Sequence, residues 1–211
     1  MPRSFTLWST PTKTFPTFVL LGGEPVSINP DFRIILKILK IHDDNEVNEM
    51  FKIKKMLEWF YLNQLSFAVQ PSEALTTLVE FIAPPETEET DPIRELYKRV
   101  RAERFAGKQP NKKYCFEFDA EEIYISFIQD YKIDLVEIEY LHWYKFLMMF
   151  ANLSKDTAFQ RKLELRTMDL KDFKGKDKTK MMKAQQAVQL PIKLNIEEKQ
   201  KMEEYLRKLM M

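Results

Sequence analysis

Apolar residues recur at helical spacing along most of the chain, and this pattern predicts a mainly α-helical protein. Asn29 and Pro30 suit a helix start as N-cap and first helical residue, so DFRIILKILKI is expected to form the first helix. A second helix is expected over residues 46–62, and a third, short helix from Ser72 to Phe81. One face of the second helix comprises Met50, Ile53, Leu57 and Phe60.

Ahead of these helices the pattern changes to two short apolar runs around a glycine pair. Residues 17–21 and 26–28 flank Gly22 and Gly23. Apolar runs that are joined by a glycine turn indicate a β-hairpin. We therefore expect a short N-terminal β-hairpin before the helical part.

The stretch from Tyr114 to Leu153 is rich in apolar and aromatic residues and is expected to form the centre of the core. Its first residues, YCFEF, alternate as in a short strand or an extended lead-in. Asp119 is expected to cap the next helix. Asp134, with Glu137 in the first turn, is expected to cap a second helix that is apolar on nearly every side. The buried face of the first of these helices is predicted to contain Ala120, Tyr124, Phe127, Ile128 and Tyr131.

The C-terminal third is more polar. Ser154 is expected to cap a helix over residues 155–166, and the basic patch KDFKGKDKTKMMK favours a solvated charged helix. Pro191 precedes a last amphipathic helix, residues 191–211, in which acids and bases are spaced for i,i+4 pairs. Its apolar stripe either binds a partner or packs back on its own domain. The stripe comprises Met202, Leu206, Leu209 and Met210.

These elements divide the chain into a leader, a body and a tail. Residues 1–16 are a polar leader, residues 17–190 form the helical domain, and residues 191–211 form the last helix. Within the domain, residues 83–113 are an insertion that contains the connector APPETEETDP and a charged helix, residues 92–104. We expect a compact domain of about seven to nine helices with a short N-terminal β-hairpin.

Composition narrows the function classes. The chain has 211 residues, enough for a substantial core, but 4 glycines, which disfavours a glycine-cradled nucleotide site. A net charge of +1 gives no overall field that recruits nucleic acid or an anionic membrane. The single cysteine excludes an internal disulfide and favours a reducing compartment, the cytosol. No apolar segment is long enough to span a membrane.

The titratable residues do not form a pattern typical of catalysis. Cys115 and His142 could serve as nucleophile and base, but a structural histidine beside an apolar helix is the favoured interpretation. Asp134 and Glu137 are expected to cap a helix, and Glu139 lies on another side of that helix. With two histidines and one cysteine the chain lacks the usual ligands of a zinc site. We therefore expect a protein that is not an enzyme and holds no metal or cofactor.

Four blocks of the sequence together carry a resemblance to a known family. They are INPDFRIILKI from Ile28, FEFDAEEIYISFIQDYKIDL (116–135), EYLHWYKFLMMFANL (139–153) and TAFQRKLELRTMDL (157–170). In order and spacing they resemble the small bacteriophage family called gene product fifteen, over roughly residues 17–190. The connector and the last helix are less well covered.

The resemblance implies a role in phage tail morphogenesis. Genes of this family lie between the tail-tube region and the tape-measure gene, where tailed phages encode tail assembly chaperones. The implied function is therefore binding of the tape-measure protein, the tail-tube protein or another tail assembly protein in the host cytoplasm, with a homo-oligomer left open. Two alternatives remain: a structural tail component or adaptor that stays in the virion, and a nucleic-acid-binding regulator, which the scarcity of aromatics in the basic patch disfavours.

The resemblance also singles out residues without assigning catalysis to any of them. Arg33 and Arg166 are either partners of buried carboxylates or, with the apolar stripe of the last helix, parts of a partner-binding surface. The expected fold determinants are Asp31, Phe32, Tyr124, Phe127, Asp134, Leu141, His142, Trp143 and Phe146.

Overall fold

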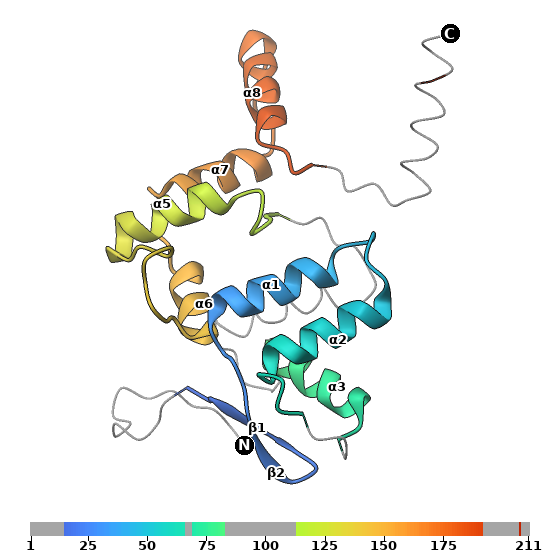
Figure 1. The fold of residues 1–211 in the computed structure, drawn as a ribbon. Helices are drawn as coiled ribbons and strands as arrows, with labels where there is room; N and C mark the ends of the chain where they lie inside the picture. Colours follow the sequence, from blue (N-terminus) through green and yellow to red (C-terminus); the bar gives the residue numbers. More distant parts are fainter. Residues whose placement is uncertain (1–14, 66–68, 83–112, 192–206, 208–211) are drawn as a thin grey trace.

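A computed structural model describes residues 15–65, 69–82 and 113–191, together with Arg207. In these residues the chain forms seven α-helices and one antiparallel pair of strands (Figure 1). The mainly α fold with an N-terminal β-hairpin is therefore confirmed. None of the described helices combines the length and the apolar character needed to cross a membrane. The expected charged helix over residues 92–104 and the apolar stripe of the last helix lie outside the described residues.

The hairpin consists of strands β1 (Phe18–Leu21) and β2 (Glu24–Ser27). Leu21 pairs with Glu24, so Gly22 and Gly23 form a two-residue turn. Both glycines have positive φ, 57° and 86°, as a type I′ hairpin turn requires. The Gly22 N–H donates to the Glu73 carboxylate at 2.8 Å, which attaches the turn to the third helix.

Three helices follow the hairpin. Helices α1 (Phe32–His42), α2 (Glu49–Phe60) and α3 (Pro71–Ile82) pack in sequence, α1 on α2 and α2 on α3. In α1 the buried positions recur at intervals of three, three and one, which places them on one face. They are Phe32, Ile35, Ile38 and Leu39.

Four more helices complete the described part: α5 (Ala120–Tyr131), α6 (Trp143–Ala151), α7 (Ala158–Thr167) and α8 (Gly175–Ala187). Helix α5 packs against α6 and α7, and α6 packs against α1, which joins the two halves of the protein. The predicted buried face of α5 was partly wrong: Phe127 is buried with Ile123 and Ser126, whereas Ala120 and Ile128 are exposed.

Helix α8 projects from the body (Figure 1). Residues 175–180 are exposed on all sides, and only the C-terminal half of α8 packs against α7. The Gln185 side-chain amide donates to the carbonyls of Leu165, Arg166 and Met168 at the end of α7, at 2.9–3.3 Å. This contact fixes the direction in which α8 leaves the body.

Helix starts are where the sequence prediction failed most often. Asp31, and not Asn29, caps α1: its Oδ1 accepts from the Arg33 N–H at 2.9 Å. The Asn29 side chain instead accepts from the Asp31 N–H, two residues too early to cap the helix. Similarly, Thr157 caps α7, because Ser154 is bound to the Asp130 carboxylate through its N–H and hydroxyl.

The central apolar helix is shorter than expected. Asp134 caps a turn, not a helix: its carboxylate accepts from the N–H groups of Val136 and Glu137 at 2.8 and 3.1 Å. Helix α6 begins nine residues later, after His142, whose ring nitrogen accepts from the Tyr144 N–H at 3.0 Å. The segment YCFEF is likewise no strand, because it leads into a turn before α5.

Stacked aromatic rings fill the centre of the core. Phe146 stacks on Phe32 of α1 at 4.8 Å and on Phe127 of α5 at 5.3 Å between ring centroids. Trp143 stacks on Phe146 and donates its indole N–H to the Ile82 carbonyl at 3.2 Å. The ring of Phe146 on α6 therefore links this helix to α1 and α5.

The substitution Phe146→Ala should lower the free energy of unfolding by about 3–5 kcal/mol, because it leaves a cavity among these rings. Phe51→Ala is a matched control, since Phe51 is half-exposed on α2 and should cost under about 1 kcal/mol. Urea denaturation followed by circular dichroism measures both. Equal losses in the two variants would contradict the assigned centre of the core.

Candidate binding pocket

The starts of α1 and α6 form a junction, on which a pocket between α1 and α5 depends. The Phe32 N–H donates to the Leu141 carbonyl at 3.0 Å, and the Trp143 N–H donates to the Pro30 carbonyl at 2.7 Å. These bonds form an isolated antiparallel bridge between Asp31 and His142, the two N-cap residues. Two helices therefore begin side by side from residues that are far apart in the chain.

Arg33 extends this junction to the loop that precedes α6. Its guanidinium holds the Asp31 carboxylate at 2.9 and 3.0 Å and also donates to the carbonyls of Ile138 and Glu139 at 3.0 and 2.8 Å. Burial alone raises the pKa of Asp31, but the hydrogen bonds from Arg33 outweigh it, so the pKa lies below its ordinary value. The loop is thus fixed at its C-terminal end by a charged pair.

The other end of the same loop is attached to α5. The Tyr124 hydroxyl donates to the Asp134 carboxylate at 2.8 Å. This hydrogen bond lowers the pKa of Asp134 and raises the pKa of Tyr124. Since Asp134 also caps the turn at Val136, the position of that residue is set from both sides.

Between α1, α5 and this loop lies an apolar pocket of about 350 Å³. Its wall is almost entirely carbon, and Val136 at its mouth is 75% exposed. We call this site the apolar pocket. It is lined by Phe32, Leu36, Phe116, Ala120, Glu121, Ile123, Tyr124, Leu135, Val136 and Phe146.

One acidic side chain lines the apolar pocket, and two more belong to the loop that forms part of its wall. Glu121 lines it, Glu137 follows Val136 in the same turn, and Glu139 belongs to the same loop. All three are exposed, and within the described residues no basic side chain forms an ion pair with them. An apolar cavity with carboxylates at its edge suits an apolar helix face that is accompanied by lysine or arginine.

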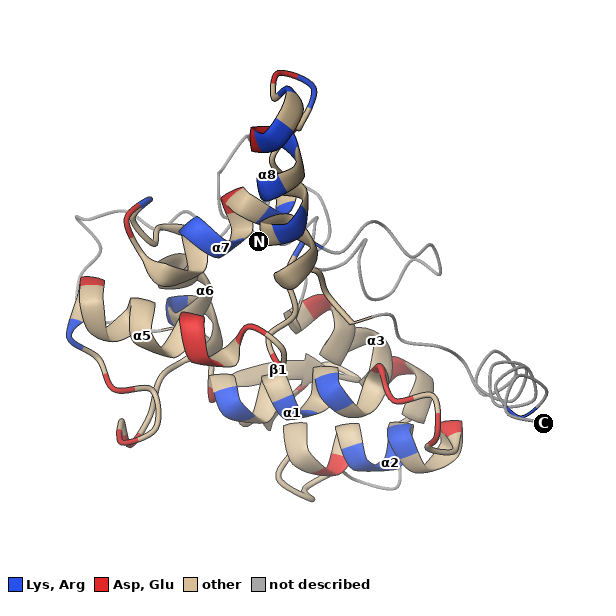
Figure 2. Cartoon of the chain, turned by 90° about the horizontal axis from the view of Figure 1, so that it is seen from above, with Lys and Arg blue, Asp and Glu red and all other residues tan. Residues whose placement is uncertain are grey.

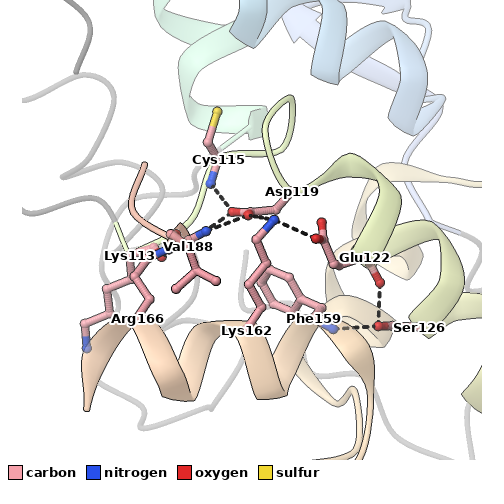
Figure 3. A network of polar contacts seen from close by, with 9 residues as sticks. All are labelled: Lys113, Cys115, Asp119, Glu122, Ser126, Phe159, Lys162, Arg166 and Val188. Atoms are coloured by element: carbon pink, nitrogen blue, oxygen red, sulfur yellow. Dashed lines mark hydrogen bonds and ion pairs between the residues drawn. The ribbon is translucent and has the colours of Figure 1, made fainter. Parts of the chain in front are cut away.

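A buried ion-pair network fixes the start of α5, next to the apolar pocket (Figure 3). Asp119 is fully buried, and Arg166 of α7 binds both of its carboxylate oxygens at 2.7 and 2.9 Å. The Cys115 N–H donates to Asp119 at 2.9 Å, and Lys162 lies 3.1 Å from its carboxylate. Because Ala120 follows Asp119 directly and lines the apolar pocket, this network positions one wall of the site.

The network changes the pKa of two of its members. Burial raises the pKa of Asp119. Hydrogen bonds from Arg166, Cys115 and Lys162 lower it by more, so the pKa lies below its ordinary value. Burial lowers the pKa of Lys162, and the Glu122 and Asp119 carboxylates more than reverse that effect. Arg166 also donates to the Lys113 and Val188 carbonyls at 2.7 and 2.6 Å, so four of its five N–H donors are used inside the protein.

The two arginines singled out from the sequence therefore both hold carboxylates. Arg33 binds Asp31 and Arg166 binds Asp119, which is the first of the two roles considered for them. Arg33 remains partly exposed beside the apolar pocket, with a side-chain exposure of 40%, whereas Arg166 is buried. The other predicted contact residues, Met202, Leu206, Leu209 and Met210, lie outside the described residues.

The structure places the expected fold determinants in two groups. Tyr124 and Asp134 are partly buried and hold the loop at the apolar pocket. The remaining ones are buried: Asp31, Phe32, Phe127, Leu141, His142, Trp143 and Phe146. Sequence reasoning gave Asp119 only a capping role, and no local pattern in the sequence identifies it as the buried partner of Arg166.

The residues considered for chemistry have structural partners. His142 caps α6, stacks on Phe15 at 4.8 Å and lies 3.1 Å from the Pro16 carbonyl. Cys115 lies in the Asp119 network. Over the described ranges, no group of three or more histidine, cysteine or acidic side chains could hold a metal ion.

Comparison with known proteins agrees with the blocks seen in the sequence. The family described as Bacteriophage Gp15 protein matches residues 14–190. The chain belongs to this bacteriophage Gp15 family. Membership makes it a phage protein and suggests a structural or tail-related one. No curated protein and no solved structure matches the chain.

Replacing Asp119 by Asn should lower the free energy of unfolding of this Gp15 family member by about 3 kcal/mol at pH 7, because Arg166 loses its buried counter-ion. Glu122→Gln is the matched control and should cost about 1 kcal/mol or less, since Glu122 makes one partly exposed ion pair. Urea denaturation at several pH values measures both variants.

The same titration tests the lowered pKa of Asp119. A carboxyl whose pKa is lower in the folded state stabilises the protein above its unfolded pKa of about 3.9. That contribution disappears as the pH falls through the folded pKa. Asp119→Asn should therefore lose less stability than the unaltered protein when the pH falls below about 4. If both proteins lose the same free energy of unfolding over that range, the lowered pKa of Asp119 is wrong.

Proposed function

We propose that this phage protein is a tail assembly chaperone that binds the tape-measure protein, and that the apolar pocket receives one of its helices. The observation that carries the proposal is an open apolar pocket, lined from α1, α5 and the loop before α6, with the exposed Glu121 carboxylate in its wall. Family membership supports a role in the phage, and the gene order implied by the resemblance supports this partner.

The physics of the partner fits such a site. A tape-measure protein is a long helical protein whose apolar faces are exposed to water until tail-tube subunits assemble around it. Burying one leucine or methionine side chain in an apolar site contributes about 1.5–3 kcal/mol. A pocket of about 350 Å³ admits few such side chains, so binding at one site is expected to be weak and reversible. Reversible binding suits a chaperone that must be displaced when the tail-tube protein arrives.

The proposed activity requires no catalysis. The apolar pocket offers aromatic and aliphatic side chains and carboxylates, with no nucleophile and base held together among its lining residues. We propose that the protein acts in the host cytoplasm during assembly and without a cofactor. The tail-tube protein or another tail assembly protein is a further partner of the same chemistry.

A second candidate function is a structural adaptor that remains in the finished tail. The feature that favours it is α8, which projects from the body and carries exposed lysines (Figure 2). Such a helix could contact an acidic surface of another tail protein. The same lysines underlie the nucleic-acid alternative, which has no stacking aromatic in α8 to support it.

Val136→Asp should reduce binding of the cognate tape-measure protein at least about tenfold, because a carboxylate would then enter the apolar site. Met50→Asp is a matched control: Met50 is 76% exposed against 75% for Val136, but it lies on α2 and does not line the apolar pocket. Co-expression, soluble yield of the tape-measure protein and co-elution on size exclusion are the measurements. If the unaltered protein forms no complex, the chaperone proposal fails; if Val136→Asp binds normally, the site is wrong.

Purified virions separate the chaperone from the adaptor. A chaperone should be lost when the tail is complete, so mass spectrometry of intact particles should find tape-measure and tail-tube peptides without this protein. Detection of the chain in stoichiometric amount would favour the adaptor. Infected-cell lysate provides the positive control for its peptides.

A further inference from the structure

The last described residues of the body lie beside the start of α5, which forms one wall of the apolar pocket. The Val188 carbonyl accepts from Arg166 at 2.6 Å, and Arg166 holds Asp119 at the start of α5 (Figure 3). A single guanidinium group thus separates the end of α8 from the residue that precedes Ala120, which lines the apolar pocket. The chain that continues after Pro191 therefore starts close to this site.

The sequence that follows has the chemistry of the ligand that the apolar pocket suits. Residues 192–211 carry the stripe Met202, Leu206, Leu209 and Met210, for which the sequence left open binding to a partner and packing on its own domain. Lys199 precedes Met202 by three positions, so on a helix it shares that face. Apolar side chains with an accompanying lysine match an apolar wall whose exposed carboxylates have no ion-pair partner in the described part of the chain.

Chain length permits the contact. Fully extended, the segment from Pro191 to Lys199, ahead of the helical stripe, can span up to about 29 Å. Attachment to the same chain also supplies a high effective concentration, on the order of millimolar for a short linker. A weak apolar contact that would not form between separate molecules can therefore form within one chain.

We propose that residues 192–211 occupy the apolar pocket of their own chain in the absence of a partner and leave it when a partner helix binds. The identity of the displacing helix rests on the proposed function, but the occupation of the apolar pocket does not. In this position the segment covers the apolar surface, and a partner helix must compete with it for the apolar pocket. If the segment occupies the site nine-tenths of the time, the apparent affinity for a partner falls about tenfold.

Disulfide formation in the full-length chain tests the contact. In a Cys115→Ser background, Val136→Cys is combined with Leu206→Cys, and oxidation is followed on non-reducing gels at low protein concentration without any partner. The control pairs Met50→Cys with Leu206→Cys. We expect at least about fivefold faster intramolecular crosslinking for the pair at the apolar pocket.

A second pair of cysteine substitutions tests the same contact in case the first variant does not fold. Glu121→Cys, an exposed lining position, is combined with Met202→Cys and compared with Glu121→Cys plus Glu204→Cys, which lies on the opposite helical face. Circular dichroism checks the fold of each variant. Rates equal to the controls in the folded variants, or crosslinking only between two copies, would overturn the proposal.

A binding measurement separates this proposal from the proposed function. Leu206→Asp should free the apolar pocket and raise the affinity for the tape-measure protein up to about tenfold. If the crosslink forms but Leu206→Asp leaves that affinity unchanged, the tape-measure protein binds elsewhere, while self-occupation stands. If the tape-measure protein binds at the apolar pocket and the crosslink does not form, only the self-occupation is wrong.

Discussion

Two helix starts that pair with each other hold the protein together. Asp31 and His142 cap α1 and α6 and face each other across backbone hydrogen bonds. The adjoining residues extend the junction: Ile28 bonds to Thr17 beside the hairpin, and Asn29 bonds to the end of α2. A buried helix start must satisfy its free N–H groups, and here each start helps to satisfy the other. The hairpin, α2, the loop at the apolar pocket and the aromatic core are all oriented by this junction.

Local sequence rules predicted which segments are helical but misplaced their starts. Asn29, Asp134 and Ser154 each have the side chain of an N-cap and the right neighbours. Each is instead engaged elsewhere: Asn29 binds the Asp31 N–H, Asp134 the Tyr124 hydroxyl, and Ser154 the Asp130 carboxylate. Two of these partners are distant in the sequence, and periodicity carries no information about them. The face of α5 was misjudged for the same reason, since α7 packs beside the side expected to face solvent.

The candidate site was less predictable than the fold. The apolar pocket draws its wall from two helices and from a loop that the apolar pattern had assigned to a helix. The apolar pattern of residues 135–142 is compatible with a helix. It contains no sign that the carbonyls of Ile138 and Glu139 accept hydrogen bonds from Arg33 instead. The two arginines were singled out by the resemblance to the family, which left open whether they pair with buried carboxylates or belong to a binding surface. Which carboxylate each one holds depends on the three-dimensional arrangement.

The two halves of α8 differ in how firmly they are held. Gln185 binds the end of α7, whereas residues 175–180 are exposed and begin with a glycine. Helical turns without tertiary contacts open at little free-energy cost. The outer turns of α8 can therefore unwind and re-form while the inner ones keep their direction. The lysine-rich start of α8 can therefore change its shape, while the end of the helix stays fixed beside the Arg166 ion pair.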